Sequence, residues 1–306
     1  MEEKRFRIDG IDGSSIHIMM YRGEDSPIGI VHLLHGMAEH CERYRHFASY
    51  LVSNGYVVYT HDHRKHGKSI AKGQTIGIFD KKDTFSNVIE DVRIVQDFIK
   101  NREKGLELIL LGHSMGSLIC RRYLQEHGAY VSKAIIMGTM AAQPLLLKVA
   151  IISGKIVRLF SSKGSRSAFL NKLVVGGFNL QFEPTRTECD WLSRDNSQVD
   201  KYLSDELCGY SYSATFYINL FKEVMISQVK ANIKKTPQIP LLFVSGASDP
   251  VGFNSEGVKK VVNLYEAFGY GENVSLKLFD GCRHEILNEI NKEEVYYYIL
   301  DWIKNH

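Results

Sequence analysis

The chain has 306 residues, 44% hydrophobic and 24% charged, so it can bury a sizeable core as one large domain or two smaller ones. Its formal net charge of +3 is too small to favour nucleic acid as a partner. The first residues, MEEKRFRIDG, lack the apolar run of a secretory signal, and polar residues and a proline interrupt the most apolar stretch, 134–152, which argues against a membrane span. Single cysteines disfavour a disulfide framework and a zinc site, so we expect a cytoplasmic protein with reduced thiols.

The first half of the chain alternates between strand and helix patterns. Apolar runs predict strands at residues 15–21, 29–34, 56–60, 106–111 and 133–137. Apolar residues at helical spacing predict the helices between them, at residues 43–54, 84–100 and 114–126. Gly55 is suited to follow the end of the first helix, and Asp83 is the expected cap of the second. Continuous apolar strands separated by helices indicate a parallel sheet that is covered on both faces.

The alternation stops at residue 141 and resumes near residue 212. The segment between them has no clear strand pattern and several breaks rich in Gly and Ser. Beyond it the pattern predicts helices at 212–235, 256–268 and 293–304, and strands at 239–245 and 274–279. We therefore expect an α/β core formed by residues 1–140 and 212–306, interrupted by a helical cap, or lid, at residues 141–211.

The expected cap is basic and apolar. Residues 141–182 contain no Asp or Glu, and their six cations are Lys148, Lys155, Arg158, Lys163, Arg166 and Lys172. A helix of this composition can contact an anionic lipid surface. It can equally pack its apolar face on the core while its lysines face water, and the two interpretations are compatible if the helix belongs to a lid.

Residues 110–116 read LLGHSMG, which places the pattern G-x-S-x-G between a predicted strand and a predicted helix. A serine at such a turn has an exposed hydroxyl, and the flanking Gly112 and Gly116 leave room where strand and helix cross. The same letters occur by chance in turns rich in Gly and Ser. The strand before and the helix after them make Ser114 a candidate nucleophile.

A serine hydroxyl needs a base and a group that orients the base. Asp249 follows the predicted strand 239–245, and His284 follows the predicted strand 274–279. Parallel strands end at one edge of a sheet, and the order serine, acid, histidine is that of α/β-hydrolases. Asp249 alone also fits a turn before a proline, and His284 alone the start of a helix. Together with Ser114 they favour a catalytic triad.

Acyl transfer also needs N–H donors for the negative oxygen of the tetrahedral intermediate. We expect these from the backbone of Met115, at the helix start, and of Met37, in the loop HGMAEH that follows strand 29–34. His113 is adjacent to the nucleophile, but neighbours on a strand point to opposite faces, so we do not expect it to be the base.

His61, His63 and His66 lie close together in the sequence with Asp62 and could suggest a metal site. They belong to one turn after a predicted strand, and no second cluster completes a ligand set. We therefore expect no metal.

Several motifs resemble those of the monoglyceride-lipase and lysophospholipase branch of the α/β-hydrolases. They are HGMAEH with the following Arg43-Tyr44, DHRKHGKS at 62–69, GHSMG at 112–116, SDPVG at 248–252, RHEILNE at 283–289, WLSRD at 191–195 and CGYSYSATFY at 208–217. The resemblance covers nearly the whole chain and is weakest over residues 141–182. It implies the α/β-hydrolase fold, with a mostly parallel sheet of roughly eight strands and a helical cap, no cofactor, and hydrolysis of lipid-like esters. Lys65 departs from the family, which commonly has glycine there.

The resemblance also implies substrate contacts. Glu39 and Arg43 match the residues that form the polar end of the alcohol pocket in monoglyceride lipases, although their spacing also fits an ordinary ion pair on a helix surface. Tyr210 and Tyr212, where the cap rejoins the core, could line the pocket or have a core or surface role.

The sequence thus predicts a serine hydrolase that cleaves carboxylic esters through an acyl-enzyme, with monoacylglycerols or lysophospholipids as the first substrates to test. The same triad would serve an aminopeptidase, an acyltransferase or a perhydrolase. A scaffold without catalysis that binds a lipid or a protein is the alternative from another class. An epoxide hydrolase or haloalkane dehalogenase is disfavoured, because its nucleophile would be Asp at position 114.

Overall fold

A single eight-stranded sheet forms the centre of the computed structural model, which describes residues 1–162 and 164–306. The strand order is β1-β2-β4-β3-β5-β6-β7-β8, antiparallel from β1 to β4 and parallel from β4 to β8. The strands are β1 Glu2–Asp9, β2 Ser15–Arg22, β3 Gly29–Leu34, β4 Tyr56–His61, β5 Leu108–His113, β6 Lys133–Met137, β7 Leu241–Gly246 and β8 Val274–Phe279. The predicted mostly parallel α/β-hydrolase sheet is confirmed.

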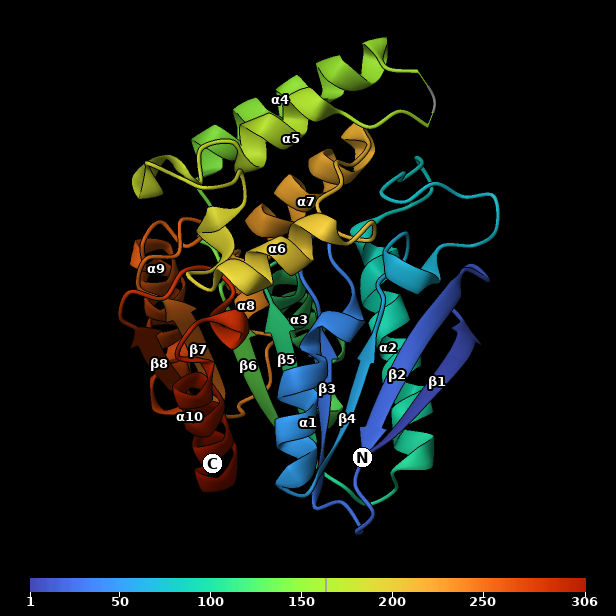
Figure 1. Ribbon diagram of the computed structural model, residues 1–306, viewed down its shortest axis with the longest axis vertical. Coiled ribbons are helices and arrows are strands. Elements are labelled where there is room, and N and C mark those ends of the chain that lie inside the picture. The colour runs from blue at the N-terminus through green and yellow to red at the C-terminus, as the bar shows by residue number, and fades with distance from the viewer. Residues whose placement is uncertain (163) are drawn as a thin grey trace.

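Helices cover both faces of this sheet (Figure 1). Residues of α1 and α10 join one hydrophobic core cluster, and residues of α2, α3, α7 and α9 join the other. Strands β3 to β7 lie between these layers, and almost all of their residues are buried, which explains their continuous apolar runs. The bounds of the core helices are α1 Arg45–Ser53, α2 Phe85–Arg102, α3 Met115–His127, α9 Glu256–Tyr265 and α10 Lys292–Asn305.

Among the described residues between β6 and β7, all regular secondary structure is helical. The helices are α4 Pro144–Phe160, α5 Ala168–Val175, α6 Asn196–Ser204, α7 Ala214–Ile226 and α8 Lys230–Ile233. Helices α4 and α5 lie at the same end of the molecule, above α7 and far from the C-terminus (Figure 1). Lys163, one of the six predicted cap cations, lies outside the described residues. The division into a core and a cap at 141–211 remains a proposal.

Several boundaries differ from the sequence prediction by a few residues, and two of the differences have a visible cause. Helix α2 is capped by Thr84, whose hydroxyl accepts the N–H of Asn87 while the Asn87 side chain accepts the N–H of Thr84. Asp83, the predicted cap, instead accepts the N–H of Asp80. The predicted helix over 212–235 is two helices, α7 and α8, separated by a turn at residues 227–229.

None of the helices in the described part of the chain combines the length and the apolar character needed to cross a bilayer.

Candidate active site

Ser114 lies at a sharp turn between β5, which ends at His113, and α3, which begins at Met115. Its φ of +55° and ψ of −120° are unusual for a residue with a side chain, and such strain is typical of functional sites. The crossing of strand and helix is so close that a Cβ at Gly112 would collide with the backbone of Gly116, and a Cβ at Gly116 with that of Leu34. The two glycines therefore allow the turn that presents Ser114.

Asp249 and His284 meet in a buried pair beyond the ends of β7 and β8. The Nδ1 atom of His284 donates a hydrogen bond of 2.9 Å to Oδ2 of Asp249. The Asp249 carboxylate also accepts the hydroxyl of Ser245 at 3.2 Å and the N–H of Val251 at 2.9 Å. Burial raises the pKa of Asp249, but the charge and hydrogen bond of His284 and the N–H of Val251 outweigh it, so the net pKa lies below its usual value. The carboxylate therefore stays charged and orients the imidazole.

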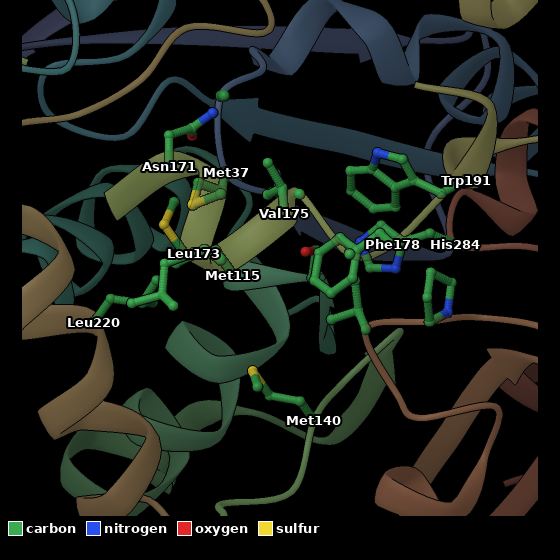
Figure 2. A pocket seen from close by; sticks show the side chains of 18 of the residues that line it. Met37, Met115, Met140, Asn171, Leu173, Val175, Phe178, Trp191, Leu220 and His284 are labelled. Atoms are coloured by element: carbon green, nitrogen blue, oxygen red, sulfur yellow. The ribbon is translucent and has the colours of Figure 1, made fainter. Parts of the chain in front are cut away.

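Ser114 and His284 line the same cavity, which has a volume of about 1180 Å³. Among the described residues no hydrogen bond joins the Ser114 hydroxyl to His284, and such catalytic bonds often tighten only when substrate is bound. The indole of Trp191 lies 5.3 Å from the His284 ring and 4.9 Å from the ring of Phe178, centroid to centroid. Figure 2 shows these three side chains together at one end of the cavity. The proposed cap thus contacts the predicted base directly.

The two predicted oxyanion donors border the same cavity, and Figure 2 shows the side chains of Met37 and Met115 close together. Met115 is the first residue of α3, where N–H groups have no partner within the helix. In the loop after β3, Gly36 donates its N–H to Glu39 and Ala38 donates its N–H to Tyr212, each at 2.5 Å. The N–H of Met37 between them has no partner among the described residues, so it is available to a ligand.

Glu39 borders the cavity, but its carboxylate is already engaged. Besides Gly36 it accepts the Tyr44 hydroxyl at 2.7 Å and Nη1 of Arg43 at 2.5 Å. Burial alone would raise the pKa of Glu39, but Arg43 and His113 hold it well below its usual value. Through these hydrogen bonds Glu39 stabilises the loop that carries Met37.

Arg43 is not part of the cavity lining and forms the ion pair with Glu39 that is the alternative interpretation of their spacing, so its contact with substrate stays a prediction. Its guanidinium forms two hydrogen bonds to Glu285, at 2.6 and 2.7 Å, in addition to the bond with Glu39. Glu285 follows His284 directly in the chain. Arg43 therefore ties the loop with the proposed oxyanion donor to the segment with the proposed base. Glu285 was missed by the sequence reasoning, although it is part of the quoted motif RHEILNE.

The two tyrosines have different surroundings. Tyr210 lines the cavity, and its hydroxyl has no hydrogen-bond partner in the described part of the chain. Tyr212 is fully buried and outside the lining, in agreement with the core role that the sequence left open. Its hydroxyl accepts the N–H of Ala38 at 2.5 Å and donates to Nε2 of His66 at 2.7 Å. Through this hydrogen bond Tyr212 supports the loop that carries Met37.

His113 is not placed to act as the base. Its Nε2 donates to the backbone oxygen of His284 at 3.2 Å, and its Nδ1 lies 2.8 Å from the Tyr44 hydroxyl. Because the single hydrogen of that hydroxyl goes to Glu39, Nδ1 must donate as well, which requires a protonated ring. Burial lowers the pKa of His113, but the negative charge of Glu39 more than offsets this and raises it above its usual value.

The histidine-rich turn is held together by internal contacts. The N–H of His63 donates to Nε2 of His35 at 3.0 Å, and the carboxylate of Asp62 accepts the N–H groups of Cys41 and Lys68. In the described ranges, ligand atoms lie within 4.8 Å of one another in two sets, His17 with Cys41 and Asp62, and His40 with Asp205 and Cys208. Neither set borders the cavity. The carboxylate of Asp62 accepts the two backbone N–H groups just named, and the carboxylate of Asp205 is hydrogen-bonded to His40.

The rest of the cavity lining is mainly apolar. Much of it comes from α4, α5 and α7, and includes Leu147, Ala150, Val174, Leu220, Phe221 and Val224. Figure 2 shows Leu173 and Val175 of α5 facing the same space as Met115, Met140 and Leu220. The volume of about 1180 Å³ slightly exceeds that of ordinary small-molecule sites, which are about 300–1,000 Å³. A long apolar group therefore fits beside Ser114.

Comparison with known proteins places this site in a family. Residues 25–291 match the family described as serine aminopeptidase, S33. The chain is 27% identical over 305 residues to a monoacylglycerol lipase of Mycolicibacterium smegmatis, covering 97% of this chain and 95% of that one. It is 26% identical over 297 residues to the human monoglyceride lipase, covering 95% and 88%. The fold matches that of a carboxyl esterase from Bacillus coagulans, solved with glycerol, with a TM-score of 0.90 and 27% identity over 100% of this chain and 99% of that chain. The chain belongs to the serine aminopeptidase S33 family of α/β-hydrolases, and within it is similar to the monoglyceride lipases.

Proposed function

We propose that this carboxylic ester hydrolase attacks lipid-like esters with Ser114, assisted by His284 and Asp249. The observation that carries the proposal is the buried pair of His284 and Asp249, whose imidazole borders the same cavity as the strained serine. The curated relatives named as monoacylglycerol lipases support the same chemistry.

The reaction proceeds in two halves. His284 takes the proton of the Ser114 hydroxyl as its oxygen attacks the ester carbonyl, and the N–H groups of Met37 and Met115 hold the negative oxygen. The carbon–oxygen bond to the alcohol then breaks, and His284 returns the proton to the departing alcohol. A water molecule, deprotonated by His284, attacks the acyl-serine and releases a carboxylic acid and the free enzyme.

The cavity favours a substrate with one long acyl chain and a small polar head, such as a monoacylglycerol or a lysophospholipid. Its apolar wall from α4, α5 and α7 would take the chain, while the ester lies at Ser114. In this proposal residues 141–211 form a cap that supplies much of that wall.

An aminopeptidase would need a free carboxylate for the ammonium group of its substrate. Glu39 and Glu285 border the cavity, but both are paired with Arg43. The third carboxylate of the lining, Glu188, is exposed and forms no ion pair among the described residues, so cleavage of an aminoacyl anilide is the assay that separates esters from peptides. Acyl transfer to other acceptors would use the same acyl-enzyme, and its products distinguish it from hydrolysis.

Purified protein should be tested on monoacylglycerols and lysophosphatidylcholine of short to long chain and on an aminoacyl anilide. We expect release of fatty acid from the lipid esters, little cleavage of the anilide, and a loss of more than about 10³-fold for Ser114→Ala. Ser132→Ala, outside the cavity, is the matched control and should retain full activity. Undiminished activity of Ser114→Ala, or cleavage of the anilide alone, would contradict the proposal.

A further inference from the structure

A short segment of the proposed cap lies against the loop that carries His284. We call residues 190–194 the clamp segment and residues 282–289 the base loop. The N–H of Glu285 in the base loop donates to the backbone oxygen of Leu192 in the clamp segment at 2.7 Å. This bond fixes the main chain directly after the proposed base.

Trp191 of the clamp segment contacts the base itself. Its backbone oxygen accepts the N–H of His284 at 3.4 Å, and its indole packs against the imidazole, with 5.3 Å between ring centroids (Figure 2). The N–H of Trp191 donates in turn to the side chain of Asn179 at 2.8 Å. Trp191 is therefore bonded to the cap on one side and to His284 on the other.

A buried carboxylate joins the two segments more firmly. Glu289, whose side chain is 0% exposed, accepts the backbone N–H of Arg283 at 2.8 Å and that of Arg194 at 3.3 Å. Nε of Arg194 donates to its other oxygen at 2.8 Å, and Nη2 of Arg194 donates to Asn291 at 2.7 Å. A buried carboxylate requires such partners. Because Arg283 directly precedes His284, the pair of Arg194 and Glu289 also fixes the main chain before the base.

Arg283 makes the reciprocal contact from the base loop to the cap. Its Nη1 donates to the backbone oxygens of Asp190 and Ser193. Its guanidinium carbon lies 4.1 Å from the centroid of the Phe182 ring, which is a cation–π contact. The residue before His284 is therefore held through both its backbone and its side chain.

The base needs such supports because it lies on a loop. Between β8, which ends at Phe279, and α10, which begins at Lys292, the described chain has only the short helix Ile286–Asn288. Catalytic groups must be held within about 0.5 Å of their productive geometry. The bond from His284 to Asp249 orients the ring, but it does not fix the main chain that carries the ring.

We propose that Arg194 is a positioning residue for the base. Through Glu289 it holds the base loop, so that His284 stays between Asp249 and Ser114. The inference rests on the proposed function, because it assigns a support to the base of that reaction. It gives the proposed cap a second role besides lining the cavity, since the clamp segment sets the position of a catalytic group.

Steady-state kinetics on a water-soluble short-chain ester test the proposal. Arg194→Met and Glu289→Gln should each lower kcat about 10- to 100-fold while KM changes little, because a small displacement of the base costs about that much. The double variant should lose no more than the more impaired single variant, since both substitutions break one contact. Arg186→Met removes the same charge from an exposed arginine of the cap that pairs with Asp200, and it should match the wild type.

Proton NMR of the same variants separates positioning from stability. The readout is the low-field signal of the Nδ1 proton of His284, which reports its bond to Asp249. We expect this signal to shift or broaden in Arg194→Met and in Glu289→Gln, under conditions where circular dichroism shows that they are folded. It should be unchanged in Arg186→Met. If Arg194→Met does not fold, Arg194→Lys is the variant to use, because it keeps a donor for Glu289 and loses the bond to Asn291.

The outcomes distinguish this inference from the proposed function. Full kcat and an unchanged His284 signal in a folded Arg194 variant, a rise in KM alone, or losses that multiply in the double variant would overturn the inference, while the proposed function would stand. If the wild type cleaves no ester, or if His284→Ala is as active as the wild type, the proposed function fails and the inference fails with it.

Discussion

Arg43 joins two parts of the site that are far apart in the sequence. Its bonds to Glu39 and Glu285 connect the loop after β3 with the loop after β8, 242 residues away. All three side chains are nearly excluded from solvent, so each charge depends on the others. Arg43 is therefore a positioning residue that holds Met37 and His284 in register.

Arg43→Lys should reduce kcat about tenfold or more while KM changes little. Lysine keeps the positive charge but cannot form the two parallel hydrogen bonds that Arg43 donates to Glu285. Arg43→Met should destabilise the protein by about 3–5 kcal/mol in urea unfolding, because it removes the cation that is bonded to two buried carboxylates. Arg186→Lys, which alters an exposed arginine paired with Asp200, is the control. A rise in KM with unchanged kcat for Arg43→Lys would instead indicate direct substrate contact.

The sequence could predict the catalytic candidates but not their supports. Ser114, Asp249 and His284 each follow a strand, and the parallel sheet alone brings such positions to one edge. The partners of Arg43 and Tyr212 depend on side-chain packing between distant segments, which no local pattern encodes. The sequence therefore left two roles open for each residue, and the structure places both side chains in buried hydrogen-bond networks outside the cavity lining.

At the scale of elements, the apolar pattern of the sequence decided which parts were predictable. Strands β3, β6 and β8 have the predicted bounds, because apolar runs flanked by turns mark them clearly. Strand β1 was not predicted, since it is an edge strand whose residues are mostly charged and exposed. The predicted helix 84–100 is α2, Phe85–Arg102, and the predicted helix 212–235 is divided into α7 and α8 by a turn that the apolar pattern does not mark.

Thr84→Ala tests the observed start of α2. Loss of the capping box should lower the free energy of unfolding by about 1 kcal/mol, within the range of 0.5–2 found for such caps. Thr75→Ala, at an exposed threonine in the preceding loop, should change it little. Equal effects of the two substitutions in urea unfolding would show that Thr84 is not the cap.

At the scale of the whole molecule, buried carboxylates link stability to pH. Glu39 and Asp249 have pKa values below their usual 4.5 and 3.8, so the unfolded chain binds protons at a higher pH than the folded one. Their contribution to stability is therefore complete above those values and is lost as the pH falls through the folded pKa values. His113 acts in the opposite sense: its raised pKa adds stability below pH 6.5 that is lost as the pH rises through the folded value.

Urea unfolding across the acid range should show a free energy of unfolding that falls steadily below about pH 5. Glu39→Gln should flatten this dependence, because it removes one of the groups that must be protonated. Asp25→Asn, which removes an exposed carboxylate, is the control. The same acid slope in Glu39→Gln and the wild type would refute the assignment to Glu39.

The most direct test of the catalytic assignment is covalent labelling by a fluorophosphonate, followed by peptide mapping. The account predicts one adduct, on Ser114, that forms on the native protein, is absent after heating, and forms at least about 10³-fold more slowly in His284→Ala. An adduct on another serine, or labelling that survives heating and the loss of His284, would contradict it.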